Sequence, residues 1–236
     1  MSFQNFTFDV DADGIALVTW NMPGRSMNVI DAKVTEELTT IVERVATEAA
    51  IKVAVLTSGK EAFCGGADLT MLEGLSRTFA ELTRSQGEEA ANQRLFDESR
   101  KLSQIARRME TCGKPWVAAL NGTAMGGGFE LALACHHRVA SENDKTRLGL
   151  PEIKVGLFPG GGGTQRIARM LQPADALQFL LKGHQLRLNR AKAMKLVDQV
   201  VLTGDLIRVA KDWIKAGGSA KAPWDVDGFK LPGGQV

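Results

Sequence analysis

Hydrophobic and polar positions follow two different periods along the first quarter of the chain. Phe6–Val10 and Ile15–Trp20 are short, largely apolar runs on either side of a turn at residues 11–14, which predicts a pair of strands. Between residues 34 and 45 apolar side chains recur at steps of three and four, which predicts a helix that Asp31 can cap. Residues 52–57, KVAVLT, are rich in β-branched side chains and predict a buried strand. A strand, a helix and a strand in this order indicate a crossover onto a parallel sheet.

The centre of the chain, residues 114–165, contains two glycine clusters and two glutamates in unusual places. Trp116–Leu120 is an apolar run that predicts a strand buried on both faces. Three glycines at 126–128 follow, and the chain then passes directly into the apolar helix pattern FELALAC. A glycine turn before a helix leaves backbone N–H groups free at the positive end of the helix dipole. The pattern therefore predicts a place that binds an oxygen carrying negative charge.

Two carboxylates accompany these glycines. Glu130 lies in the first turn of the predicted helix, where favourable interaction with the helix dipole alone would explain an acid. The apolar neighbours of Glu130 instead predict burial, which raises the pKa of a carboxyl toward values that suit proton transfer. Glu152 precedes the apolar segment IKVGLF and is the second candidate acid.

Four further glycines, at 160–163, precede a predicted helix that Thr164 can cap. A glycine run before a helix can bind phosphate, but neither G-x-x-x-x-G-K-[ST] nor G-x-G-x-x-G fits this cluster. We interpret residues 160–163 as a tight turn with close backbone packing, and keep a nucleotide-phosphate site as an alternative.

A glycine pair also follows the strand at residues 52–57. Gly65 and Gly66 come after its carboxyl end, where ligands of open α/β sheets usually bind. If this strand lies beside Trp116–Leu120, the amides of Gly65 and Gly127 could converge on one oxygen. Such a pair stabilises an oxyanion by about 3 kcal/mol per donor.

The remaining segments give weaker signals. Residues 71–93 carry mixed charge and yield no assignment, whereas the apolar spacing from Leu95 to Glu110 predicts one long helix. Three short helices are expected at 174–181, 189–197 and 205–215, the second running into the apolar DQVVL. Residues 217–236 contain five glycines and two prolines and read as a linker-like tail. We therefore expect a domain at 1–216 and a linker at 217–236 that leads toward a further region of a longer protein.

Composition narrows the function classes. The 236 residues are 44% hydrophobic and 24% charged, with a net charge of +2, which suits one globular core and gives no reason to invoke nucleic acid or a membrane surface. No stretch approaches 18 apolar residues and the first residues lack a signal core, so we expect a cytoplasmic or otherwise reducing location. The three cysteines form no C-x-x-C pair, and the adjacent His136 and His137 would point about 100° apart on a helix. We expect no metal site, and interpret both histidines and His184 as structural or surface residues.

Three motifs in this order and spacing, EAFCGGADL, NGTAMGGGFELALAC and LGLPEIKVGLFPGGGGTQRIAR, resemble the enoyl-CoA hydratase/isomerase, or crotonase, superfamily over about residues 5–215. PGRSMNVID and PWDVDGFKLPGG resemble more particularly the hydratase portion of multifunctional fatty-acid oxidation proteins. In those proteins a 3-hydroxyacyl-CoA dehydrogenase region follows. The resemblance implies an α/β fold, the ClpP/crotonase spiral of β-β-α units, which agrees with the strand pair and the crossover.

The resemblance also implies roles for individual residues. The oxyanion-hole amides correspond to Gly65 and Gly127, and the catalytic acids to Glu130 and Glu152. No metal or redox cofactor is implied, since coenzyme A is part of the substrate, and the expected partners are further copies of the chain or a thiolase. The residues that match the family's CoA-contacting loops are Arg25, Ser26, Met27, Gly66, Ala67 and Asp68.

The reaction that this reading predicts is the reversible hydration of a trans-2-enoyl-CoA. Glu130 would activate water for attack at the β carbon, and Glu152 would protonate the α carbon. The alternatives are a Δ3-Δ2-enoyl-CoA isomerase, which can work with one glutamate, both activities together, or a catalytically weak domain that only binds acyl-CoA.

Overall fold

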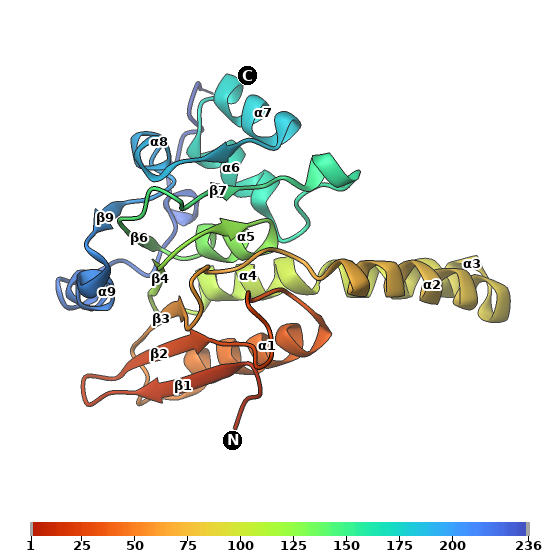
Figure 1. The fold of residues 1–236 in the computed structure, drawn as a ribbon, viewed down its shortest axis with the longest axis horizontal. Helices are drawn as coiled ribbons and strands as arrows, with labels where there is room; N and C mark the ends of the chain where they lie inside the picture. Colours follow the sequence, from red (N-terminus) through yellow and green to blue (C-terminus); the bar gives the residue numbers. More distant parts are fainter. Residues whose placement is uncertain (1, 235–236) are drawn as a thin grey trace.

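The computed structural model describes residues 2–234 and contains two sheets. The larger sheet has the order β1-β2-β3-β4-β6-β9 and is parallel except for β1, which pairs antiparallel with β2 (Figure 1). Its strands are β1 Phe6–Val10, β2 Ile15–Trp20, β3 Val53–Ser58, β4 Trp116–Leu120, β6 His137–Ser141 and β9 Gln199–Val201. The smaller sheet contains β5 Ala124–Met125, β7 Leu148–Gly149 and β8 Gln185–Leu186.

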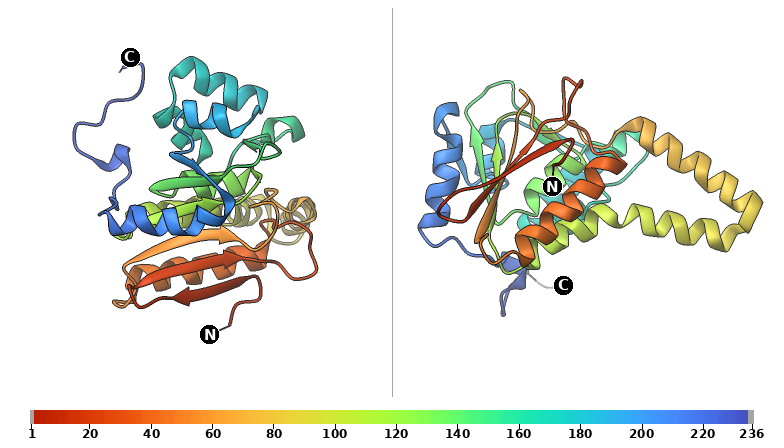
Figure 2. Two further views of the ribbon diagram at one scale, coloured as in Figure 1. Left: turned by 60° about the vertical axis from the view of Figure 1, so that its left-hand side comes forward. Right: turned by 90° about the horizontal axis from the view of Figure 1, so that it is seen from below.

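Helices cover both faces of the larger sheet (Figure 2). The main core lies between the sheet and the helices α1, α4 and α5, whereas a smaller core forms where α9 packs on the opposite face through Leu206 and Ala210. The α-helices are α1 Ala32–Thr47, α2 Leu69–Gln86, α3 Glu88–Ser99, α4 Lys101–Thr111, α5 Gly127–Leu133, α6 Gly163–Met170, α7 Pro173–Lys182, α8 Leu188–Ala193 and α9 Leu206–Lys215. Short 3-10 helices are η1 Glu152–Val155, η2 Thr203–Asp205 and η3 Pro223–Asp225.

The chain is built from repeated β-β-α units, as the resemblance implied. The units are β1-β2-α1, β4-β5-α5 and β6-β7-α6 in chain order. The Asp31 carboxylate caps α1 by accepting a hydrogen bond from the Val34 amide at 2.8 Å. β2 and β3 pair in parallel with Ile15 opposite Val53, so the crossover predicted from the sequence is confirmed.

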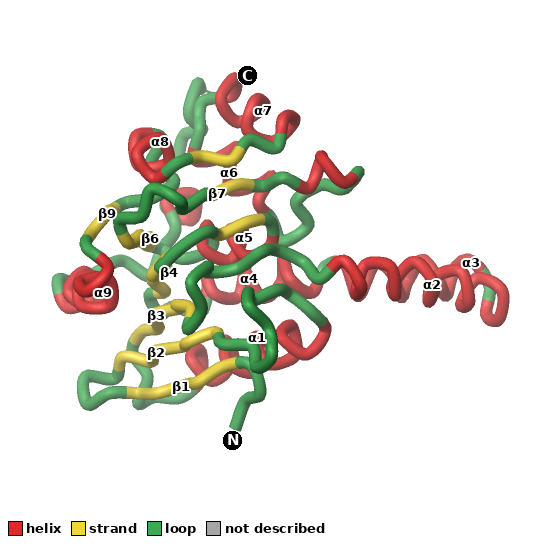
Figure 3. The backbone as a smooth tube through the Cα atoms, viewed as in Figure 1, coloured by secondary structure: helices red, strands yellow, loops and turns green. Residues whose placement is uncertain are grey.

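The segment that the sequence left unassigned forms a helical hairpin. α2 and α3 run side by side and project away from the body, and Figure 3 shows that the projection is helical along its length. The single helix expected from Leu95 to Glu110 is instead the end of α3 and all of α4, separated only by Arg100. α4 joins the main core through Ile105 and Met109, both buried.

Two predicted helix ends differ from those observed. Thr164 does not cap α6, because the helix already begins at Gly163 and no side chain at its cap position accepts a bond. The Gly163 amide instead donates to Glu130 Oε1 at 2.7 Å, so a distant carboxylate replaces the local cap. α8 ends at Ala193, short of the expected 197, because the chain turns at Lys195, which has a φ of 59°.

The last described residues follow an irregular path but contact the body. Ala222 is buried, and Asp225 in η3 accepts hydrogen bonds from Arg107 at 2.6 and 2.7 Å. The linker role of residues 217–236 stays a prediction, and residues 235–236 lie outside the described part. None of the helices in residues 2–234 is both long enough and apolar enough to cross a bilayer.

Candidate active site

The two glycine segments after β3 and β4 lie side by side. The parallel pairing of these strands continues into a bridge between Cys64 and Ala124, where the Met125 amide donates to the Cys64 carbonyl at 2.9 Å. A Cβ placed on Gly66 would lie 3.8 Å from Gly126 Cα, so the two backbones nearly touch. The convergence of these segments, which the sequence predicted conditionally, is present.

Gly65 is not available as the first oxyanion donor. Its amide donates to the Asn28 carbonyl at 2.9 Å, inside a set of backbone bonds that join residues 28–30 to residues 65–68. The Met27 sulfur covers Gly65, since it would lie 2.5 Å from a Cβ at that position. The structure therefore corrects the assignment of Gly65, because the neighbouring loop already uses its N–H.

The backbone amides of Ala67 and Gly127 are free to donate. Within the described residues neither N–H has a hydrogen-bond acceptor, although the adjacent Asp68 amide donates to the Ile30 carbonyl at 2.8 Å. The bridge between Cys64 and Ala124, and the close approach of Gly66 to Gly126, bring the segments that contain Ala67 and Gly127 together. Sequence reasoning assigned Ala67 only to the CoA-contacting loop, and its N–H is identified as a second candidate donor by the backbone bonds that its neighbours already make.

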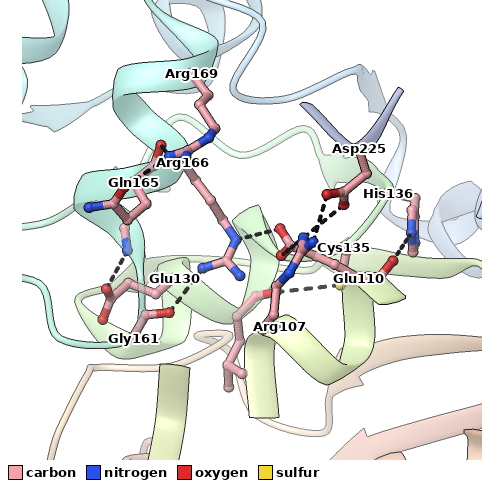
Figure 4. Close-up of polar contacts among 12 residues, drawn as sticks. Arg107, Glu110, Glu130, Cys135, His136, Gly161, Gln165, Arg166, Arg169 and Asp225 are labelled. Carbon is pink, nitrogen blue, oxygen red and sulfur yellow. Dashed lines mark hydrogen bonds and ion pairs between the residues drawn. The ribbon is translucent and has the colours of Figure 1, made fainter. Parts of the chain in front are cut away.

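Glu130 is buried on α5 and its carboxylate is held in place. Glu130 is only 2% exposed, and its Oε1 accepts a hydrogen bond from the Gly163 amide at 2.7 Å (Figure 4). Burial raises the pKa of Glu130, while bonds from the Gly163 and Gly161 amides and the charge of Arg166 act against the rise. The burial predicted from the apolar neighbours of Glu130 is confirmed.

The glycine run at 160–163 is explained by what lies against it. A Cβ on Gly161 would be 2.9 Å from Glu130 Oε2, and one on Gly163 would be 2.9 Å from Glu130 Oε1. Close packing was the interpretation drawn from the sequence, and the structure confirms it. The sequence did not indicate that the loop packs on the catalytic candidate Glu130.

Glu152 lies at the start of η1, half-buried and beside the other glycine cluster. Its Oε1 would be 3.0 Å from a Cβ on Gly126, and its Oε2 has no hydrogen-bond partner within the described residues. Burial raises the pKa of Glu152 to about 7, and repulsion from Glu130 adds to the rise. Both acids therefore border the Gly126–Gly127 backbone, and at neutral pH Glu152 can both give and accept a proton.

The raised pKa of Glu152 predicts how stability changes with pH. The folded protein binds more protons than the unfolded chain between the ordinary value of 4.5 and about 7, so the unfolding free energy falls as pH rises through this window. A shift of this size corresponds to about 3 kcal/mol, which partial solvent access reduces to about 1–2 kcal/mol. Glu152→Gln is expected to increase stability by that amount at pH 8 and much less at pH 4.5. Urea unfolding of both proteins at the two pH values measures the difference, and an equal difference at both pH values would contradict it.

Among the predicted CoA-contacting residues, the structure joins Arg25 to Asp68. Their side chains form an ion pair at 2.8 Å, and Asp68 also caps α2 by accepting the Thr70 amide bond at 2.8 Å. Burial alone would raise the pKa of Asp68, but the Thr70 and Arg25 contacts outweigh it and lower the pKa. Ser26 and Met27 are exposed on the same loop as Arg25, and Met27 lies next to Gly65. The binding role of these residues and of Gly66 and Ala67 stays a prediction.

Exposed apolar side chains follow Glu152 along the chain. The segment that begins with η1 exposes an unusual amount of apolar surface, and Leu69 at the start of α2 is 62% exposed. The sequence predicted no role for this segment. Its exposed members are Ile153, Val155, Leu157 and Phe158.

Other reactive groups do not join this site. Burial raises the pKa of both Cys64 and Cys135 to about 12, so neither thiol supplies a thiolate at neutral pH. Among residues 2–234 no cluster of three or more histidine, cysteine, aspartate or glutamate side chains has the arrangement of a metal site. The groups described at this site are two carboxyls with raised pKa values and two backbone amides that have no acceptor within the described residues.

Comparison with known proteins identifies relatives of this chain. The sequence profile of the family described as enoyl-CoA hydratase/isomerase matches residues 11–220. The fatty acid oxidation complex subunit alpha of Shewanella amazonensis is 40% identical over 221 residues, which are 93% of this chain and 29% of that protein. The subunit of the same name from Idiomarina loihiensis is 40% identical over 207 residues, 87% of this chain and 27% of that one. The chain thus spans less than a third of the length of these relatives.

Solved structures show the same fold. The crystal structure of an enoyl-CoA hydratase from Bacillus anthracis superposes with a TM-score of 0.75 at 29% sequence identity. The match covers 90% of this chain and 76% of that one. The β-β-α spiral inferred from the motifs is therefore the fold of this chain.

Proposed function

We propose, since the chain belongs to the enoyl-CoA hydratase/isomerase family, that it catalyses the reversible addition of water to a trans-2-enoyl-CoA to give a 3-hydroxyacyl-CoA. One observation supports this most strongly: two amides without an acceptor in the described residues, Ala67 and Gly127, lie on adjoining segments beside two acids whose pKa values are raised. A hydratase needs this set, because the negative charge develops on the thioester oxygen while two protons move nearby.

The steps follow from these positions. The thioester oxygen accepts hydrogen bonds from Ala67 and Gly127, each of which stabilises the developing enolate by about 3 kcal/mol. Glu130 takes a proton from water as the water oxygen bonds to the β carbon, and the alkene electrons move to the thioester oxygen. The enolate electrons then return to form the bond between the α carbon and the proton of Glu152. Exchange of protons with solvent restores a charged Glu130 and a neutral Glu152.

The surroundings suit an acyl thioester. Asp68 follows Ala67 and pairs with Arg25 on the facing loop, where the CoA part would bind. The exposed apolar segment 153–158 after Glu152 would contact the acyl chain. Because the named relatives are fatty acid oxidation complex subunits, we extend the proposal to β-oxidation in the cytoplasm, with a thiolase or further copies of this chain as partners.

Isomerisation of a Δ3-enoyl-CoA is the second candidate. Glu152 favours it, because a half-buried acid with an unpartnered oxygen and a pKa of about 7 can both remove and return a proton. A third possibility, binding without chemistry, requires no proton transfer by either acid.

A turnover assay beside a binding titration separates these candidates. Hydration removes the conjugated enoyl thioester absorbance, isomerisation of a 3-enoyl-CoA creates it, and calorimetry with a CoA thioester detects binding. We expect loss of the absorbance with a trans-2-enoyl-CoA. Binding with no change of absorbance in either assay would overturn the proposed function.

Gly161→Ala is expected to slow hydration without unfolding the protein. The new Cβ would lie 2.9 Å from both Glu130 Oε2 and Leu102, so the acid must move, and a displacement of about 1 Å costs roughly 100-fold in rate. Gly160→Ala is the matched control, since a Cβ there meets no atom within 4 Å. Kinetics and thermal unfolding of both variants provide the test, and equal kcat values for the two would show that the contact with Glu130 is unimportant.

A further inference from the structure

A buried ion pair lies behind Glu130 and belongs to none of the roles described above. Arg166 on α6 and Glu110 on α4 have side chains only 6% and 3% exposed, and Nε of the arginine is 2.7 Å from Oε1 of the glutamate. Charges this deeply buried are costly unless each is paired, and the desolvation cost can exceed the attraction, so a buried ion pair is weak evidence of added stability. The position of the pair therefore matters more than its strength.

Arg166 also contacts the glycine loop that holds Glu130. Its Nη1 donates to the Gly161 carbonyl at 3.0 Å, and a Cβ on Gly162 would lie 2.4 Å from the same nitrogen. The Gly163 amide, next along this loop, donates to Glu130 Oε1 at 2.7 Å (Figure 4). Because the loop is all glycine, it has few side-chain contacts of its own, and the guanidinium fixes its path.

The same network reaches the C-terminal segment. Glu110 Oε2 accepts a bond from Arg107 Nη1 at 3.1 Å, and Arg107 pairs with Asp225 at 2.6 and 2.7 Å. Figure 4 shows these side chains between η3 on one side and the glycine loop on the other. A continuous series of charged contacts therefore leads from residue 225 to the loop around Glu130.

We propose that Arg166 is a positioning residue for Glu130, acting through the Gly161–Gly163 backbone, and that Asp225 supports it through Arg107 and Glu110. This inference rests on the proposed function for the role of Glu130 as base. Within the described residues two charged groups act on Glu130, Arg166 on α6 and Glu152 on η1, and the charge of Arg166 is paired with Glu110 on α4. Arg166 acts against the rise of the Glu130 pKa, so its removal has a titration signature as well as a kinetic one.

The experiment uses the charge-matched double variant Glu110→Gln with Arg166→Met, which removes both members of the buried ion pair together. We expect kcat for hydration to fall by roughly 10- to 100-fold with KM near the wild-type value. Carbon-13 NMR of the labelled Glu130 carboxyl should show a higher pKa. Arg169→Met is the matched control: within residues 2–234 that guanidinium, one turn along the same helix, donates hydrogen bonds to Gln165, and its charge acts on Asp225 at the far end of the network.

Arg166→Lys provides a second route if the double variant fails to fold. Lysine keeps the charge near Glu110 but lacks the planar fork that reaches two acceptors at once, so we expect a reduced kcat with the Glu130 pKa near wild type. Asp225→Asn should lower kcat by a smaller factor than Arg166→Lys, and an unchanged kcat would remove the segment around residue 225 from the proposal.

Different results would contradict the positioning role of Arg166 and the proposed function. If the wild-type protein lacks hydratase activity, the proposed function is wrong, while the NMR titration still reports whether Arg166 controls Glu130. If the double variant and Arg166→Lys both keep the kcat and the Glu130 titration of Arg169→Met, Arg166 has no positioning role.

Discussion

Glu130→Gln is expected to lower kcat for hydration by about 10²- to 10⁴-fold, the usual contribution of a positioned general base. The amide keeps the size of the side chain and can still accept the Gly163 N–H bond, which is 2.7 Å long in the wild type, but it cannot take a proton from water. Steady-state kinetics with a trans-2-enoyl-CoA measure the effect.

Binding provides the control for this variant. The affinity for a saturated acyl-CoA should stay close to wild type, because the proposed thioester donors are the backbone amides of Ala67 and Gly127. Hydration at the wild-type rate in Glu130→Gln would remove this residue from the mechanism.

Glu152→Gln is expected to lower kcat for hydration by a similar factor, and to abolish isomerisation. In both reactions this acid exchanges a proton with the substrate carbon, whereas Glu130 is required only where water is activated. We therefore expect Glu130→Gln to retain isomerisation and Glu152→Gln to lose it. The reverse pattern, with isomerisation surviving only in Glu152→Gln, would exchange the two roles.

The pH profiles of the wild type and of Glu152→Gln give an independent check on the roles of the two acids. Glu152 must carry a proton to act as the acid in hydration, and its pKa is about 7, so kcat/KM should fall as the pH rises through that value. Glu130 must be charged to act as base, so the rate should also fall on the acid side, below the raised pKa of Glu130. In Glu152→Gln the residual rate should lose its alkaline limb, and an unchanged alkaline limb would assign it to another group.

Local patterns in the sequence predicted the elements that build the site. Short apolar runs and β-branched content located β1 to β4, and the glycine turn before FELALAC located the N-terminus of α5 with Glu130 in its first turn. These signals are local, because a buried strand or a helix start imposes its own spacing on the residues within it. The motifs then supplied the order of the β-β-α units.

The errors concern contacts between distant segments. Gly65 looked like a free donor because the sequence does not show that residue 28 lies beside it and accepts its N–H. Thr164 looked like a cap because the sequence does not show that the Glu130 carboxylate reaches Gly163 from another helix. The pairing of Glu110 with Arg166, 56 positions later, has no local signature at all.

The account depends on two amides and two acids that meet around one thioester. The most direct test is a crystal structure of Glu130→Gln with a bound trans-2-enoyl-CoA. We predict that the thioester oxygen lies roughly 2.7–3.1 Å from both the Ala67 and Gly127 nitrogens, with the β carbon facing residue 130 and the α carbon facing Glu152. A thioester oxygen bound elsewhere, or bound by neither amide, would contradict the account.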